Sequence, residues 1–157
     1  MEKKVEEAFG FFENYMKDAT VSVFETQGEL QPVILFMKEK NGKMGLEVIS
    51  VNMDRKDEVA FILQRVRMAV PICALISESW MVKAKPGEPI DEKIPPSKHP
   101  NRIESVMLTL YCDTDVKCYT AEIVRPEGNK PFLMAWECVS HDAEISGRFI
   151  DAPAEWN

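Results

Sequence analysis

The 157-residue chain is poor in the residues that build many catalytic and cofactor sites. It has seven glycines and two histidines, and it contains no Gly-rich phosphate loop, no Gly-x-Ser-x-Gly elbow and no His-Glu-x-x-His helix. Those motifs supply the backbone donors, nucleophiles and metal ligands of whole enzyme classes. Nucleotide hydrolysis is therefore disfavoured, and we expect neither a cofactor nor a metal ion.

Positive charge and long apolar runs are also scarce. The chain has 19 Lys and Arg against 26 Asp and Glu, and no more than two basic residues stand in succession. Nucleic-acid binding depends on Lys and Arg that neutralise phosphates. No run approaches the ~18 apolar residues that a membrane span needs, and the first residues lack the apolar core of a signal peptide. We expect a soluble cytoplasmic protein without a nucleic-acid or membrane partner.

The cysteines are few and scattered: Cys73, Cys112, Cys118 and Cys138 include no Cys-x-x-Cys pair. Isolated cysteines in apolar runs are typical of buried, reduced thiols. Cys112 and Cys118 flank a predicted turn at 113–115, and a five-residue hairpin loop would bring them opposite each other. A disulfide or metal role for these two stays an alternative.

Two amphipathic helices are predicted. Apolar residues recur every three or four positions over residues 2–18, which is typical of a helix with one buried face. A second helix follows Asp54, whose side-chain oxygen is a suitable N-cap, and Pro71 stops it.

The remaining apolar segments of the chain predict strands. Asn41-Gly42 indicates a hairpin, because both residues tolerate a positive φ. Strands do not alternate with helices, so we expect an α+β fold in which two helices cover one face of a mainly antiparallel sheet. The order is α-β-β-α-β-β-β-β in a single domain, residues 1–157, with a tail from residue 140. The six predicted strands are 32–38, 44–51, 72–82, 103–112, 116–124 and 132–139.

A proline-rich excursion at 84–102 joins the third and fourth strands. A connection of this length is uncommon in a compact domain, and such loops tend to be functional or disordered. Its prolines make it stiff. It holds five of the ten prolines: Pro86, Pro89, Pro95, Pro96 and Pro100.

The two strands beside the excursion each carry a glutamate on an apolar face. Side chains alternate along a strand, so Glu78 shares a face with Ile76 and Glu104 shares one with Val106. A buried carboxylate needs a cation or a hydrogen bond. Arg102, two residues from Glu104, is the expected partner. The two glutamates are neighbours if residue 78 pairs with 104, and far apart if 82 pairs with 104.

A functional interpretation of the same residues adds His99, which titrates near neutrality. Glu78, His99, Arg102 and Glu104 are candidate catalytic residues of a pocket beneath the excursion. Trp80 and Ser97 would line that pocket and bind a ligand.

The segments Glu78-Ser79-Trp80 and Pro100-Asn101-Arg102-Ile103-Glu104 support one resemblance. With a Glu-small-Trp strand and a Pro-x-Arg-x-Glu strand start, the chain resembles small uncharacterised bacterial and phage proteins. The resemblance implies that these residues belong together, and no activity is attached to it.

Two functions of different classes follow. The first is a non-enzymatic binding or assembly module of a bacterium or phage, forming a homodimer through a sheet edge or through the apolar side of the last strands. Pro32 and Pro131 are the residues that would protect the edges of the sheet. The second is a metal-independent enzyme or small-ligand binder, with Glu78 or Glu104 as general base and Arg102 holding an anionic group.

Overall fold

The computed structural model describes residues 3–82, 87, 93–112 and 115–139. Two long helices and five of the strands appear in the predicted order, and a short 3-10 turn, η1, precedes the fourth strand. The elements are α1 (Lys3–Gln27), β1 (Val33–Lys40), β2 (Lys43–Ser50), α2 (Lys56–Ala69), β3 (Ile72–Val82), η1 (Pro96–Lys98), β4 (Arg102–Cys112), β5 (Val116–Val124), β6 (Phe132–Leu133) and β7 (Glu137–Cys138).

The strands form one antiparallel open sheet of seven strands, in the order β2-β1-β3-β4-β5-β6, with β7 also pairing β5. This confirms the predicted α+β class and the order of elements. The last strand differs from the prediction: β6 and β7 are two short strands where one strand at 132–139 was expected. Both pair with the outer side of β5, β6 at its C-terminal end and β7 at its middle.

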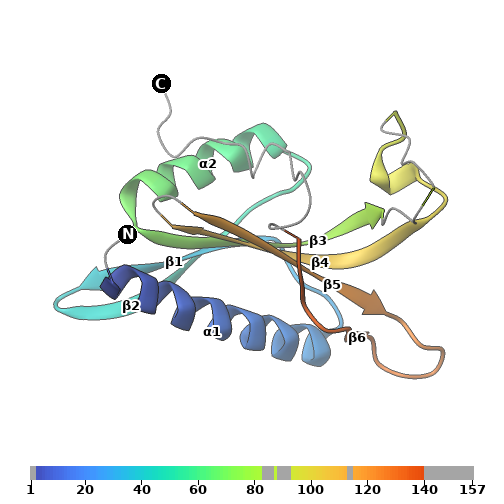
Figure 1. Ribbon diagram of the computed structural model, residues 1–157, viewed down its shortest axis with the longest axis horizontal. Coiled ribbons are helices and arrows are strands. Elements are labelled where there is room, and N and C mark those ends of the chain that lie inside the picture. The colour runs from blue at the N-terminus through green and yellow to red at the C-terminus, as the bar shows by residue number, and fades with distance from the viewer. Residues whose placement is uncertain (1–2, 83–86, 88–92, 113–114, 140–157) are drawn as a thin grey trace.

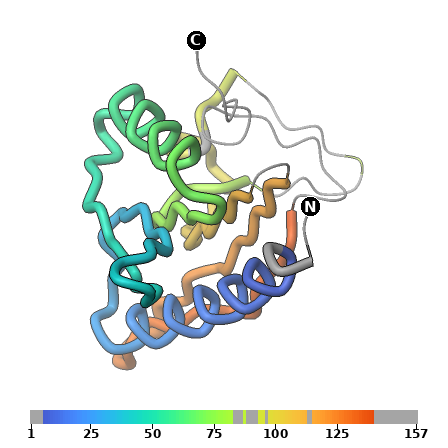
Figure 2. Tube along the Cα trace, turned by 90° about the vertical axis from the view of Figure 1, so that its left-hand side faces the viewer, coloured from blue at the N-terminus to red at the C-terminus, as the bar shows by residue number. Residues whose placement is uncertain are grey.

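The expectation that both helices cover one face of the sheet is wrong. Figure 1 shows α2 above the sheet and α1 below it, and Figure 2 shows the strands lying between the two helices from the side. The cores agree with this arrangement. Phe12 and Phe24 of α1 pack with Leu35, whereas Leu63 of α2 packs with the neighbouring Ile34. Adjacent residues of one strand point to opposite faces, so the domain has three layers.

The central strand β3 explains why two covering layers are needed. Ile72 and Ile76 are buried in the α1 cluster, while Cys73 and Leu75 are buried in the α2 cluster. A strand that is apolar on both sides must be covered on both sides. The signal is present in the sequence as an unbroken apolar run.

Helix α1 is longer than the predicted helix at 2–18. Thr20 and Phe24 extend the buried stripe of Met16 at intervals of four, so packing overrides the weaker helix propensity of β-branched residues. The helix ends where Gly28 adopts φ +78 and donates its N–H to the Phe24 carbonyl at 2.7 Å. A glycine with positive φ is a usual helix terminator.

The structure confirms the hairpin turn that Asn41-Gly42 predicts. Asn41 and Gly42 have φ values of 54 and 77, as in the two-residue turns that suit hairpins. The start of α2 differs from expectation, because its first flanking residue is Arg55 and no side chain caps the helix. Asp54 instead donates its backbone N–H to Asn52 Oδ1 at 3.0 Å.

The four cysteines are free thiols, and Cys73, Cys112 and Cys118 are buried as expected, but the expectation is wrong for Cys138, which is exposed. The strand register does not place Cys112 and Cys118 opposite each other, as a disulfide between them would require. Cys118 instead lies opposite Thr109 and accepts a hydrogen bond from the Thr109 hydroxyl at 3.8 Å. No helix among the described residues is long and apolar enough to cross a membrane. The tail from residue 140 and most of the excursion's first half lie outside the described residues.

Candidate functional site

Glu78 and Glu104 come together on the α1 face of the sheet. Glu104 lies opposite Trp80, and Glu78 lies opposite Val106, so the register falls between the two that the sequence left open. The two glutamates are therefore diagonal neighbours on one face of β3 and β4. Diagonal side chains of this kind are within reach of a long third side chain.

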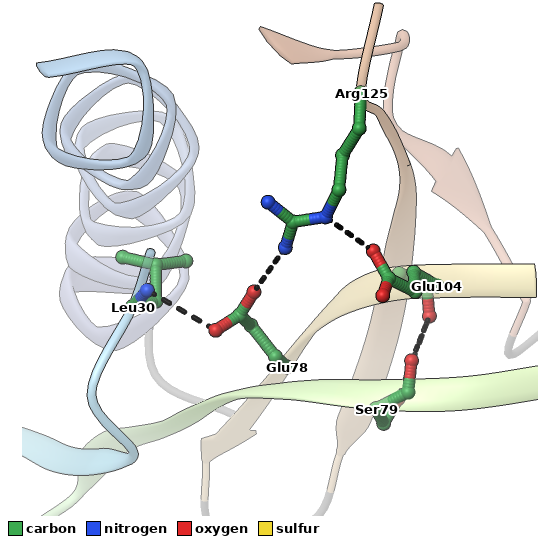
Figure 3. Close-up of polar contacts among 6 residues, drawn as sticks. Leu30, Glu78, Ser79, Glu104 and Arg125 are labelled. Atoms are coloured by element: carbon green, nitrogen blue, oxygen red, sulfur yellow. Dashed lines mark hydrogen bonds and ion pairs between the residues drawn. The ribbon is translucent and has the colours of Figure 1, made fainter. Parts of the chain in front are cut away.

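That third side chain is Arg125, which directly follows β5. Its Nε donates to Glu104 Oε2 at 2.6 Å, and its Nη2 lies 3.5 Å from Glu78 Oε1. Figure 3 shows the guanidinium between the two carboxylates. One cation thus joins β3, β4 and the end of β5 on the same face.

Glu78 also holds the segment between α1 and β1. The Leu30 N–H donates to Glu78 Oε2 at 3.3 Å, as Figure 3 shows. Beside this contact, on the other face of the sheet, the Ser105 hydroxyl donates to the Ser79 carbonyl at 3.2 Å. These bonds fix the margin of the sheet where α1 ends.

The cluster is partly open to solvent. The side chains of Arg125, Glu78 and Glu104 are 48%, 32% and 37% exposed. The hydrogen bond to Glu104 raises the pKa of the Arg125 guanidinium, which therefore keeps its charge. Water screens ion pairs at such exposures, so the cluster stabilises the sheet margin modestly.

The expectation that Arg102 pairs with Glu104 is wrong. The Arg102 guanidinium lies over the Trp80 ring, 5.0 Å from its centroid, and its Nη1 donates to the His99 carbonyl at 3.2 Å. Arg102 precedes Glu104 by two positions and lies opposite Val82 at the end of the β3–β4 pair. Its side chain therefore reaches the outer end of the ladder while Arg125 occupies the space between the carboxylates.

The other two candidates lie beside Arg102 in the connection that leads into β4. His99 is buried, and its Nδ1 accepts the Asn101 N–H at 3.0 Å, so this ring nitrogen closes a local turn. Ser97 is exposed in η1. The described contacts join Arg102 to His99 and Trp80, and separately join Glu78 to Glu104 through Arg125, whereas Ser97 is described only as exposed.

Sequence reasoning missed a second polar cluster, between α1 and β5. The Tyr119 hydroxyl donates to Glu13 Oε1 at 2.7 Å, and Lys117 Nζ lies 3.3 Å from the same oxygen. Lys17 approaches both, with its Nζ 3.9 Å from Glu13 Oε2 and 3.7 Å from the centre of the Tyr119 ring. The cluster fastens the helix to the sheet.

The electrostatics of this second cluster follow from burial and charge. Burial raises the pKa of Glu13, but the Tyr119 hydrogen bond and the Lys117 ammonium outweigh it and hold that pKa below its usual value. Burial raises the pKa of Tyr119, and the neighbouring carboxylate raises it further. Tyr119 therefore stays protonated as a hydrogen-bond donor at neutral pH.

A third feature, also missed, is an apolar surface beside the first hairpin. Phe11 and Tyr15 on α1 and Met44, Leu46 and Val48 on β2 are all exposed, and we call these five residues the open apolar face. A cavity of about 550 Å³ lies between α1 and the hairpin, lined by Phe12 and Met37 with four members of that face. Single exposed apolar residues are ordinary, whereas large contiguous apolar patches are rare on monomeric soluble proteins.

Comparison with family models, with curated proteins and with solved structures returns no match for this chain.

Proposed function

We propose that this protein is a non-enzymatic assembly module that self-associates through the β2 edge of its sheet. The observation that carries the proposal is the open apolar face. Leu46 lies opposite Met37, and Val48 lies opposite Leu35, a member of the α1 core. The exposed residues of β2 thus extend the α1 core outward to the margin of the sheet.

The two margins of the sheet differ in protection. The outer side of β5 is partly covered by β6 and β7, whereas no described strand pairs with the outer side of β2. Native proteins usually protect an edge with charge, proline or a bulge, because an unpaired edge is a template for another chain. On its α1 face β2 presents Met44, Leu46 and Val48 instead.

The composition of the surface agrees with an interface. Aromatic residues and methionine are enriched where proteins meet, and charged residues are depleted at the centre of such contacts. The open apolar face joins two aromatic residues of α1 to Met44, Leu46 and Val48, and Phe11 is 74% exposed. Burying these side chains against a partner would remove their apolar surface from water, which favours association.

The alternative, an acid–base site beneath the excursion, has less support from the geometry. Both carboxylates are engaged by Arg125, and Glu78 also accepts the Leu30 N–H. Arg102, the residue expected to hold an anionic group, lies over Trp80. A structural role at the sheet margin accounts for these contacts without a substrate.

Light scattering over a concentration series from low to high micromolar tests self-association. We expect the wild type to gain mass with concentration, and Met44→Lys to remain a monomer because its charge would be buried on association. Met134→Lys is the matched control, since Met44 and Met134 are 59% and 51% exposed and Met134 lies on the opposite margin. A wild type that stays monomeric throughout, or equal effects of the two substitutions, would overturn the proposal.

A further inference from the structure

We infer that two copies join β2 to β2 in antiparallel fashion, with the twofold axis passing through Gly45. The inference rests on the proposed self-association and adds its register. It follows from the direction of the β2 backbone, from the glycine in the middle of the strand and from the placement of charge on the α2 face.

The direction of the backbone comes from the hairpin. A two-residue turn closes on a hydrogen-bonded pair, here Lys40 and Lys43, and such pairs alternate with non-hydrogen-bonded pairs along an antiparallel ladder. The odd-numbered residues of β2 therefore bond to β1. Met44, Leu46 and Val48 direct their backbone N–H and C=O groups away from β1, toward a second copy.

Gly45 lies between two of these outward residues. It is exposed, and a Cβ there would meet only the Lys38 carbonyl oxygen, at 3.9 Å, so the fold of one copy leaves room for a side chain. Glycine inside a strand weakens it and often marks a place where another backbone comes close. An axis through Gly45 places it opposite Gly45 of the second copy in a non-hydrogen-bonded pair, where side chains approach most closely.

Charge on the α2 face selects the same register. With the axis at Gly45, Lys43 lies opposite Glu47 of the second copy, and this pair occurs twice. Lys43, Lys38 and Lys40 share this face of the hairpin, so a carboxylate from outside offsets their mutual repulsion. On the α1 face, Met44 then meets Leu46 of the second copy.

Neighbouring registers lack this complementarity. An axis at Leu46 places Lys43 opposite Ile49 and Glu47 opposite Gly45, so no charges pair. An axis at Glu47 places two glutamates opposite each other, and an axis at Lys43 does the same with two lysines. Like charges directly opposite each other destabilise a strand pair.

Charge reversal tests the register by sedimentation equilibrium. Lys43→Glu and Glu47→Lys should each raise the dissociation constant about tenfold or more, because each replaces two attractive pairs by two repulsive ones. The double variant carrying both changes should return to within about threefold of the wild type, since the pairs are restored in reverse. Thermal unfolding of each variant checks that the monomer folds.

A disulfide adds a second measurement that does not depend on affinity. In a Cys138→Ser background, Gly45→Cys should form a covalent dimer on mild oxidation, because Cα atoms about 4.5 Å apart suit a disulfide. Ser50→Cys, exposed on the same strand, should not, since its symmetry mate would lie about 33 Å away. Association that survives both single reversals, or equal cross-linking of the two cysteines, overturns the register but not self-association. A monomeric wild type would overturn both the register and self-association.

Discussion

Arg125 donates a hydrogen bond from Nε to Oε2 of Glu104 across 2.6 Å, although 21 positions separate the two residues. Arg102, only two positions away from Glu104, lies over Trp80 instead. The contact shows that the charge balance of this sheet margin is set by strand register and not by proximity along the chain.

Arg125→Met should lower the free energy of unfolding by about 1 to 2 kcal/mol, because two partly buried carboxylates lose their shared cation. Arg102→Met is the matched control and should cost about 1 kcal/mol or less, since it loses an exposed contact with an aromatic ring and one hydrogen bond to the His99 carbonyl. Urea unfolding at neutral pH measures both. A larger loss for Arg102→Met would contradict the assignment of Arg125.

Glu13 should make stability depend on pH below its usual pKa of 4.5. Its pKa is lowered in the folded protein, so its stabilising contribution is fully present above 4.5 and is lost as the pH falls through the folded value. Glu13→Gln should therefore be less stable than the wild type at pH 7, and the difference should shrink in acid. Urea unfolding across this range gives the difference.

The control for Glu13 is Glu25→Gln, which changes an exposed carboxylate of the same helix. That variant should show little difference from the wild type at either end of the range. If the loss of stability in Glu13→Gln stays constant with pH, packing and not the charge of Glu13 holds α1 against β5.

The thiols should differ sharply in reactivity. Burial raises the pKa of Cys73 to about 12, and Cys112 and Cys118 are also buried, whereas Cys138 is exposed. Because the thiolate is the reactive form, one thiol per chain should react rapidly with an alkylating reagent under native conditions. Mass spectrometry should place the modification at Cys138, and Cys138→Ser should abolish the fast phase. Fast labelling of Cys73 would contradict the described core.

Much of the fold could be predicted from local patterns. The bounds of β3 and β5 match the prediction, because apolar runs and turn residues define them directly. The Asn41-Gly42 turn fixed the first hairpin for the same reason. The order of elements did not predict that the helices cover opposite faces, which follows from β3 being apolar on both sides, as the burial of Cys73 and Leu75 in the α2 cluster shows.

The candidate site was harder, because it depends on register. The pairing of Tyr111 with Val116 places Arg125 on the face of Glu104, and a slip of one residue would turn it to the other face. The turn at 113–115 did not specify that register. The sequence did identify Glu78 and Glu104 as carboxylates that need a cation, and it named the wrong arginine.

The open apolar face could have been found with one further step. Met44, Leu46 and Val48 alternate with Gly45 and Glu47 along β2, which indicates a strand with one apolar face. That face is open because the buried residues of α1 share their core cluster with Ile76, Leu108 and Ile123 of β3, β4 and β5, and with no buried residue of β2. The path of α1 across the sheet is a tertiary feature that no local pattern specifies.

Residue-resolved amide exchange at two protein concentrations tests the central claim, self-association through the β2 edge, most directly. The Met44 and Leu46 amides point away from β1, so they should exchange fast in dilute solution and slow down at high concentration, when a second copy accepts their hydrogen bonds. Gly45 and Glu47 amides bond to β1 at all concentrations and serve as internal controls. Fast exchange of Met44 and Leu46 at every concentration would contradict the account.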